Sequence, residues 1–265
     1  MKYLRNTLVG LALLAVLVVS LLWFLPARWV MPWIEPQLNG LRLQQIDGSV
    51  WDGDAGEVIG VDGRRLGRLH WQLSRRALLG DVRMRVAFDG PRLGFSGAMR
   101  RLPDSRVAVD DFRLHADLAV LDGYPPSPWG RPRGELRLTV EHALLQGGWP
   151  VQLQAHGLWR HAAVHAAGND VALGDMQITA QAQGGVVEAR WHDAGGGPLH
   201  VTGELQLSPL GWRLDSTLRA RQTDRALQRW LARLGPASAD GSVHIRQSGG
   251  LAAPATSTER GDRSP

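Results

Sequence analysis

The stretch RLHWQL, residues 68–73, alternates apolar and polar side chains. As a β-strand it would place Leu69, Trp71 and Leu73 on one face and the polar residues between them on the other. The same period of two returns in residues 82–88, after which the letters FDGP predict a turn. The two segments therefore predict neighbouring strands of a sheet with one buried and one solvated face.

This pattern continues through most of the chain. The sequence contains 32 glycines and 15 prolines, which favour turns, and 11 tryptophans between them. We therefore expect a mainly β protein built on an antiparallel, curved sheet. Further strands are expected at residues 136–140, 151–155, 176–182, 186–191, 199–207, 212–218 and 243–245.

One segment has the period of a helix instead, and we expect a single short C-terminal helix over residues 223–235. Thr223 is the expected N-cap, and Gly235 followed by Pro236 would end the helix. Apolar side chains recur between them at helical spacing, at Ala226, Leu227, Trp230, Leu231 and Leu234.

The region around RLHWQL recurs downstream. GSVW at residues 48–51 corresponds to HGLW at 156–159, and each copy continues with Leu-Gly and an alternating strand. The offset between matching positions stays between 105 and 108 residues, which predicts an internal duplication of a β-unit. The second copy keeps the Gly and Trp of the first but not its acidic residues. The residues assigned to this structural motif are Gly48, Trp51, Gly53, Gly67, Gly157, Trp159 and Gly174.

Five segments follow from this interpretation. Residues 1–27 would form a cytoplasmic tip and a transmembrane anchor, and residues 28–121 a first β-unit. The Pro-rich residues 122–134 would be a linker, and residues 135–248 a second β-unit that includes the helix. Residues 249–265 contain little to bury and are expected to be disordered.

The N-terminus contains an apolar run that begins at Leu8 and ends at Leu25, 18 residues without a charge. As a helix it would be about 27 Å long, close to a hydrocarbon core of roughly 30 Å. The basic residues before it predict a cytoplasmic N-terminus and a periplasmic C-terminal domain, so we expect a single-pass protein of the cell inner membrane. Trp29 and Trp33 would lie at the bilayer edge. A cleaved signal peptide is the alternative, but its apolar region is shorter, about 7 to 15 residues.

The charge distribution argues against nucleic acid as a partner. The net charge is +5, and 29 of the 30 basic residues are arginine. These arginines alternate with apolar residues, as on the solvent face of a strand, and do not form basic runs with interleaved aromatic residues. The chain contains no cysteine, which excludes disulfides, thiolate metal sites and a cysteine nucleophile.

An acidic stretch follows the first Trp of the motif. Asp52, Asp54 and Glu57 have a spacing that loosely suggests a calcium loop. The stretch lacks the twelve-residue frame and the terminal bidentate Glu of such loops. We therefore expect a solvated β-turn.

Other candidate sites are also incomplete. His156, His161 and His165 form the densest histidine group, but no HExxH motif or neighbouring carboxylate accompanies them, so surface histidines are expected. Ser96 lacks a G-x-S-x-G frame, and the glycines at 195–198 are expected in a hairpin loop. We accordingly assign no catalytic residue, no metal ligand and no cofactor, and expect the protein not to be an enzyme.

Tryptophan allows two interpretations. Each side chain could bury roughly 200 Å² in a core. Alternatively, some could line an exposed groove for an extended peptide or a lipid chain, since an open sheet must cover its apolar face or use it. The tryptophans in question are Trp51, Trp71, Trp129, Trp149, Trp159, Trp191 and Trp212.

Taken together, these elements resemble the type II secretion system protein N family over nearly the whole chain. The similarity rests on the PARW juncture at 26–29 after an apolar N-terminus, GSVWDG at 48–53, the Leu-Gly strand at 66–71, and Asp240 with Gly241 before a last strand. The β-pattern is also similar to that of AsmA-like proteins, whose curved sheets form an apolar groove.

The resemblance implies a bitopic inner-membrane protein of a Gram-negative bacterium that assists the export of folded proteins across the outer membrane. Its expected partners are other type II secretion components, namely the inner-membrane platform and the outer-membrane secretin. The AsmA-like pattern implies an alternative, a protein of the cell envelope that binds or transfers lipid or acyl chains.

Overall fold

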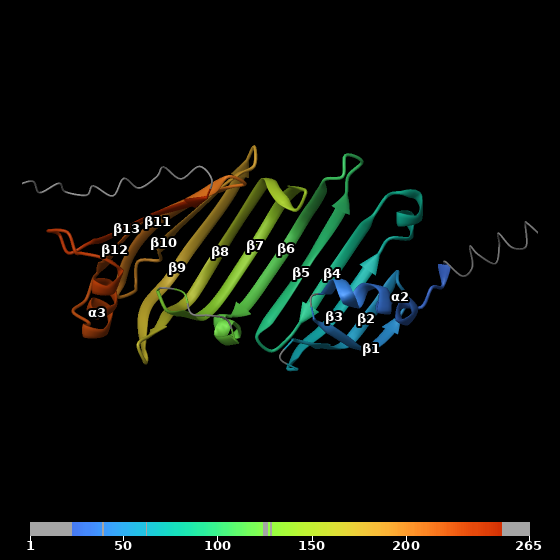
Figure 1. Ribbon diagram of the computed structural model, residues 1–265, viewed down its shortest axis with the longest axis horizontal. Helices are drawn as coiled ribbons and strands as arrows, with labels where there is room; N and C mark the ends of the chain where they lie inside the picture. Colours follow the sequence, from blue (N-terminus) through green and yellow to red (C-terminus); the bar gives the residue numbers. More distant parts are fainter. Residues whose placement is uncertain (1–22, 39, 62, 124–126, 128, 251–265) are drawn as a thin grey trace, which may run out of the picture.

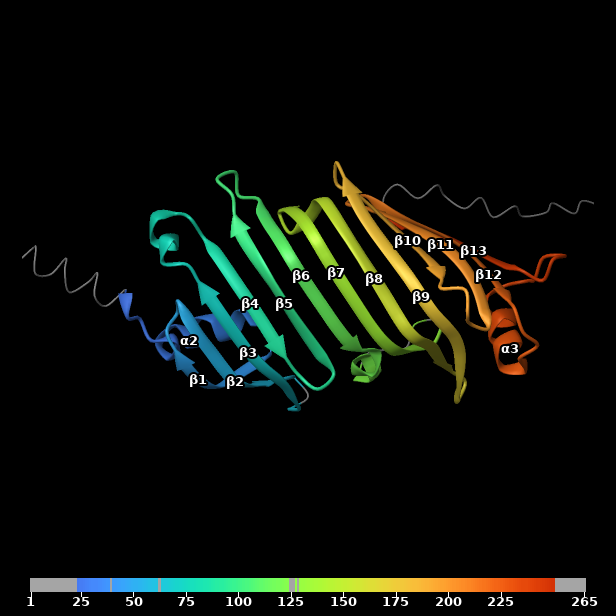
Figure 2. The ribbon, with the colours of Figure 1, turned by 180° about the vertical axis from the view of Figure 1, so that it is seen from behind.

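The computed structural model describes residues 23–250 except 39, 62, 124–126 and 128. In this part of the chain thirteen strands form one antiparallel sheet whose spatial order is the order of the sequence. The sheet is a long curved ribbon with a helix near each end (Figures 1 and 2). The strands are β1 (Arg42–Gly48), β2 (Asp52–Ile59), β3 (Arg65–Leu73), β4 (Arg83–Asp89), β5 (Leu93–Arg101), β6 (Val107–Asp117), β7 (Arg131–Gln146), β8 (Trp149–Ala166), β9 (Asn169–Gln183), β10 (Val186–Asp193), β11 (Leu199–Ser208), β12 (Gly211–Ala220) and β13 (Val243–Gly250).

Helical elements are few in the described residues. The helices are α2 (Ala27–Ile34) and α3 (Arg225–Leu234), and the short 3-10 helices are η1 (Glu35–Leu38), η2 (Arg75–Leu79) and η3 (Leu118–Gly123).

Two-residue turns connect the longest strands. Residues 147–148 and 184–185 are Gly-Gly pairs with φ between 58° and 83°, which is the conformation of a type I′ turn. Ala167 and Gly168 form the same turn between β8 and β9, with φ values of 50° and 80°. Such turns match the twist of the strands that they join, so each strand pairs with the next one in sequence.

Bulges help the sheet to curve. Asp111 has a φ of 52°, and the register between β5 and β6 shifts there, opposite Gly97. His161 has a φ of 49°, and its backbone N–H donates to the carboxylate of Asp175 in the next strand at 2.7 Å. Each bulge bends its strand and increases the local twist.

The sequence prediction of a mainly β, antiparallel and curved sheet is confirmed, and all seven further strand segments lie inside strands. The C-terminal helix is also present, but Asp224 rather than Thr223 is its N-cap. The Asp224 carboxylate accepts hydrogen bonds from the backbone N–H groups of Ala226 and Leu227, at 2.6 and 3.0 Å. A carboxylate at this position also interacts favourably with the helix dipole.

The expectation that the β-domain has only the C-terminal helix was wrong, because residues 27–34 form α2. This helix begins after Pro26, and its buried residues Ala27 and Met31 are one turn apart. The sequence places residues 28–34 in the first β-unit, with Trp29 and Trp33 at the bilayer edge, and predicts no helix there. The i, i+4 pair was the available signal, but it is weak in a helix of eight residues.

The Pro-rich stretch does not interrupt the sheet. Strand β7 begins at Arg131, within the expected linker, and pairs with β6 from Glu135 onward. Its first residues pair with β8 alone, so Pro132 removes no hydrogen bond to β6. The division into two duplicated β-units therefore stays a prediction.

The two ends of the chain are described only in part. Within the described residues, no helix has the length and apolar character needed to cross a bilayer. The predicted anchor, Leu8 to Leu25, lies outside the described residues except for positions 23–25. Gly249 and Gly250, placed in the tail by the sequence, end strand β13, and the rest of the predicted tail lies outside the described residues.

Candidate functional site

One face of the sheet is apolar, and an aligned row of residues runs along it from β4 to β10. The strand register aligns Phe88, Phe95, Leu114 and Leu138 in a single row across β4 to β7. The row continues through Gly157, Ile178 and Trp191 on the next three strands. A period of two along each strand and direct pairing between strands thus combine short sequence patterns into one continuous surface, which we call the apolar face.

Aromatic rings pack against one another on this face. The ring centroids of Phe88 and Phe95 are 5.3 Å apart, and those of Phe95 and Phe112 are 6.1 Å apart. Phe112 lies on β6 directly after the bulge at Asp111. The bulge shifts the alternation by one residue, so the apolar side chains of β6 stay on the same face along the strand.

Helix α2 covers the β1 end of the apolar face. Ala27 and Met31 pack in a cluster with residues of β1 to β4, among them Ala55, Trp71 and Phe88. Figure 1 shows α2 in front of β1, β2 and β3. This burial removes the apolar side chains of the first strands from water.

Helix α3 covers the other end. Leu227, Trp230 and Leu231 of α3 are buried in a cluster that includes Met176 of β9 and Leu199 of β11. The Trp230 indole N–H donates to the backbone oxygen of Trp129 at 2.8 Å, which connects the helix to the segment before β7.

Between the two helices the apolar face is open. Phe112, Leu114, Leu138, Val140 and Leu153, on β6 to β8, are all partly exposed. They belong to neither of the two clusters that the helices complete. A contiguous exposed apolar surface of this kind typically marks a binding site. This open part of the apolar face is our candidate functional site.

The opposite face is polar and carries ion pairs between strands. The His142 ring lies 2.7 Å from the carboxylate of Asp110, and Arg246 lies 2.9 Å from that of Asp215. All four side chains are solvated, so each pair contributes at most about 1 kcal/mol. The arginines that alternate with apolar residues therefore form a solvated face, as the sequence predicts.

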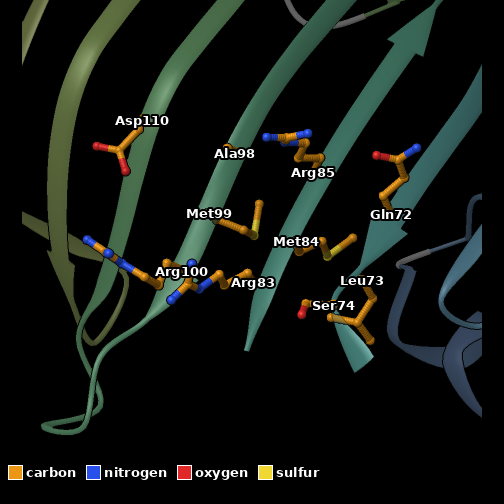
Figure 3. A pocket seen from close by; sticks show the side chains of 10 residues that line it. All are labelled: Gln72, Leu73, Ser74, Arg83, Met84, Arg85, Ala98, Met99, Arg100 and Asp110. Carbon is orange, nitrogen blue, oxygen red and sulfur yellow. The ribbon is translucent and has the colours of Figure 1, made fainter. Parts of the chain in front are cut away.

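A hollow of about 430 Å³ lies over β3 to β6 (Figure 3). Arg83, Arg85 and Arg100 line it together with one carboxylate, Asp110, so its charge favours an anion over a cation. Ser74 also lines the hollow, but its hydroxyl accepts a hydrogen bond from the backbone N–H of Arg76 and caps η2. The residues that line the hollow include no histidine that could act as a base for this hydroxyl.

Asp193 is the most strongly perturbed carboxylate, and its side chain is only 3% exposed. Burial alone would raise its pKa, but hydrogen bonds from Val201 N–H, Arg221, His200 and Gly195 N–H lower the pKa to about 2. The carboxylate fixes the loop between β10 and β11, which is the hairpin loop that the sequence predicts at residues 195–198. Its partners come from this loop, from β11 and, in the case of Arg221, from the residue after β12, which indicates a structural role.

The glycines of the sequence motif lie at close backbone approaches. A Cβ on Gly67 would come within 2.7 Å of Gly90 Cα, and one on Gly174 within 2.6 Å of Gly197 Cα. Gly53 lies beneath the indole of Trp71 and Gly157 lies in the row of the apolar face. These glycines have packing roles and do not form a common site.

Two of the seven tryptophans singled out by the sequence are core residues, since Trp51 and Trp71 are 6% and 8% exposed. Trp159 and Trp191 are partly exposed and pack against the buried cluster under α3, so they also contribute to a core. The interpretation that some tryptophans line a groove stays a prediction. The indole N–H of Trp159 donates to the backbone oxygen of Arg133 at 2.8 Å. The others are Trp149, which is partly exposed, and Trp129 and Trp212, which are 38% and 39% exposed.

The acidic stretch after Trp51 is not the turn that the sequence predicts, because Asp52, Asp54 and Glu57 lie in strand β2. Glu57 pairs with Arg65 at 3.2 Å. The turn itself comes earlier, at residues 48–51, where the left-handed backbone of Gly48 allows it. Asp52 and Asp54 alternate with buried positions of the strand and face solvent, whereas the Glu57 side chain is only 20% exposed.

The expectation that no carboxylate neighbours the histidine group was also incorrect. The ring of His165 lies 2.6 Å from the carboxylate of Asp170, and that of His156 lies 3.3 Å from Glu141. Both carboxylates come from the adjacent strand, so sequence spacing does not reveal them. Among the described residues, no three His, Cys, Asp or Glu side chains are grouped as metal ligands would be.

Comparison with known proteins identifies the family to which the chain belongs. The model of the family "Type II secretion system (T2SS), protein N" matches residues 39–246, which extend from just before β1 into β13. No curated protein and no solved structure matches the chain significantly. Since the match covers most of the chain and the whole apolar face, the protein belongs to the type II secretion system protein N family.

Proposed function

We propose that this protein is a non-enzymatic component of the type II secretion machine. Its N-terminal segment holds it in the inner membrane, the sheet lies in the periplasm, and the protein assists the export of folded proteins across the outer membrane. The family match over residues 39–246 carries this proposal. The partners are other components of the machine, namely the inner-membrane platform and the outer-membrane secretin.

Deletion of the gene in the native organism tests this function. We expect exported proteins to accumulate in the periplasm and to reach the medium again when the wild-type gene is restored. Crosslinking in intact cells should recover platform or secretin subunits with the protein. Unchanged secretion, together with unchanged assembly of the machine, would argue against the proposal.

The membrane topology has its own test. A phosphatase reporter that requires the periplasm, fused after Leu251, should be active, and the same reporter fused before Leu8 should be inactive. The basic residues before the apolar run predict this orientation. A stable but inactive fusion after Leu251 would overturn the periplasmic location.

A second function is favoured by the open part of the apolar face, namely binding of a lipid through its acyl chain. The sheet strands use their backbone N–H and C=O groups to pair with each other, so the face offers side chains alone. A peptide laid on it would find no partners for its own backbone, at a cost of roughly 1–3 kcal/mol for each buried unpaired group. An acyl chain has no polar group along its length and gains about 0.8 kcal/mol per buried CH₂.

Native mass spectrometry of the full-length protein extracted in mild detergent tests this second function. We expect the wild type to retain lipid. Leu138→Asp should retain about tenfold less lipid than the wild type, because the new charge lies in the middle of the apolar row. Thr139→Asp is the matched control, since the neighbouring residue lies on the opposite face of the same strand. Wild-type protein that repeatedly purifies without lipid would exclude lipid binding.

A further inference from the structure

The turn at residues 48–51 holds the segment at which the predicted anchor ends. The backbone oxygen of Leu25, the last residue of the apolar run, accepts a hydrogen bond from Val50 N–H at 3.0 Å. Pro26 forms a β-bridge with Ser49. The anchor sequence and the folded sheet are thus connected without any intervening linker residue.

Internal hydrogen bonds make this turn rigid. The Ser49 hydroxyl accepts from the backbone N–H groups of Trp51 and Asp52, at 3.2 and 3.1 Å. Gly48 has a φ of 82°, and a Cβ there would lie 2.5 Å from the backbone oxygen of Asp52. No residue other than glycine fits this position without displacing the backbone.

The turn is also held by the sheet below it. The Trp71 indole N–H donates to the backbone oxygen of Val50 at 3.2 Å, and Leu73 N–H donates to that of Trp51 at 2.7 Å. Both donors belong to β3. The junction at Leu25 is therefore fixed relative to the first three strands.

The outer side of α2 adjoins this junction and is unusually apolar. Ala27 and Met31 face the sheet, while Trp29 and Trp33, one turn apart, are 55% and 79% exposed. Phe24, directly before the junction, is 74% exposed. Large aromatic side chains rarely remain this exposed in water, whereas indole rings are favourable at the headgroup level of a bilayer.

We propose that residues 48–51 are a socket that fixes the chain where it leaves the bilayer, and that the outer side of α2 lies in the headgroup layer. The inference rests on the proposed membrane anchor and extends it. We expect a lipid bilayer to contact the outer side of α2, because the 18-residue apolar run ends at Leu25, one residue before the bridge at Pro26. The socket then sets the orientation of the whole sheet, and of its apolar face, to the membrane.

The absence of cysteine makes this orientation measurable. The full-length protein would be reconstituted into phosphatidylethanolamine–phosphatidylglycerol vesicles as Trp33→Cys, carrying an environment-sensitive fluorophore, with a quencher attached to the lipid headgroup region. The control is Leu210→Cys, which is 61% exposed in the turn between β11 and β12 at the other end of the sheet. We expect quenching at position 33 to be roughly threefold stronger than at 210. Equal quenching at the two positions would show that α2 does not lie in the headgroup layer.

The socket is tested in the same assay with a second substitution. Gly48→Val in the Trp33→Cys background should abolish most of the additional quenching, because the junction is no longer held. Gly241→Val is the matched control, since Gly241 has a φ of 76° but lies in open space. Circular dichroism checks that both variants fold, and unchanged quenching in a folded Gly48→Val variant would contradict the socket. The measurement on Trp33→Cys alone does not depend on this variant.

Extraction of native membranes at alkaline pH separates this inference from the proposed function. A protein released by this treatment would lack the anchor, and both proposals would then fail. If the protein remains in the membrane and secretion depends on it, but position 33 is not quenched, the proposed function stands and the socket proposal fails.

Discussion

Trp51 is only 6% exposed, although it ends a turn at the start of β2. Replacing it with alanine removes one of the largest buried side chains and leaves a cavity. We expect Trp51→Ala to destabilise the protein by roughly 3–5 kcal/mol, measured by urea unfolding. Trp212→Ala, at a position that is 39% exposed, is the control and should cost much less. A similar loss in the two variants would place Trp51 outside the core.

The charge of Asp193 stabilises the fold in a defined pH range. Because the folded-state pKa is lowered from 3.8 to about 2, the stabilisation is present above pH 3.8 and is lost as the pH falls through 2. The shift corresponds to about 2 kcal/mol. Asp193→Asn should therefore destabilise the protein more at pH 6 than at pH 2.5, measured by urea unfolding at both values.

A solvated carboxylate provides the control for this pH dependence. Asp215 forms an exposed pair with Arg246, and Asp215→Asn should change stability by less than about 1 kcal/mol at either pH. If Asp193→Asn were equally destabilising at pH 6 and pH 2.5, the lowered pKa would not be the cause of its effect.

At the scale of elements, the turn between β8 and β9 is strained. Ala167 has a φ of 50°, where the Gly-Gly turns of the same sheet have no Cβ. Asparagine tolerates this conformation, and Asn-Gly is a favoured type I′ pair. Ala167→Asn should stabilise the protein by about 1 kcal/mol in urea unfolding. The same substitution at Ala172, exposed in β9, should bring no gain, and a gain at both sites would rule out the turn as the reason.

The N-cap of α3 is a second element that can be tested. Asp224→Ala removes the acceptor of two backbone N–H groups and should cost about 1 kcal/mol. Thr223→Ala is the direct comparison, since the sequence points to Thr223 and the structure to its neighbour. A larger loss of stability for Thr223→Ala, measured by thermal unfolding, would restore the cap expected from the sequence.

At the scale of the whole molecule, the sheet crosses the Pro-rich stretch without a break. Strands β6 and β7 pair from Val107 with Leu145 to Asp117 with Glu135. Hydrogen exchange followed by mass spectrometry should show the backbone amides of β6 and β7 as well protected as those of the adjacent strands. Faster exchange confined to this boundary would instead indicate two β-units that open independently.

Much of the fold could be predicted from local patterns. RLHWQL and the segments like it place a side chain on one face or the other because the strand period is two, and this does not depend on distant residues. The hairpin loop predicted at residues 195–198 likewise lies between β10 and β11. The eight-residue helix α2 was missed because its amphipathic pattern is too short to stand out from the aromatic residues around it.

The candidate site was less accessible to sequence reasoning. No motif marks Phe112, Leu114 or Leu138, since each is an ordinary apolar residue of an ordinary strand. The bulge at Asp111 keeps Val109 on the same face as Phe112, and bulges depend on the pairing of strands. The sequence motifs likewise did not predict the carboxylate partners of His156 and His165, because these carboxylates lie on neighbouring strands.

By itself, then, the sequence determined the β class, the alternation of faces, the hairpin loop at 195–198, the C-terminal helix and the membership of the type II secretion system protein N family, because each of these depends on neighbours along the chain. Only the tertiary structure decided that the strands form one unbroken sheet, that α2 and α3 cover its two ends, and that the apolar face stays open between them. It also decided that the turn at 48–51 holds Leu25. These features depend on strand register and on contacts between segments far apart in sequence, which local patterns do not encode.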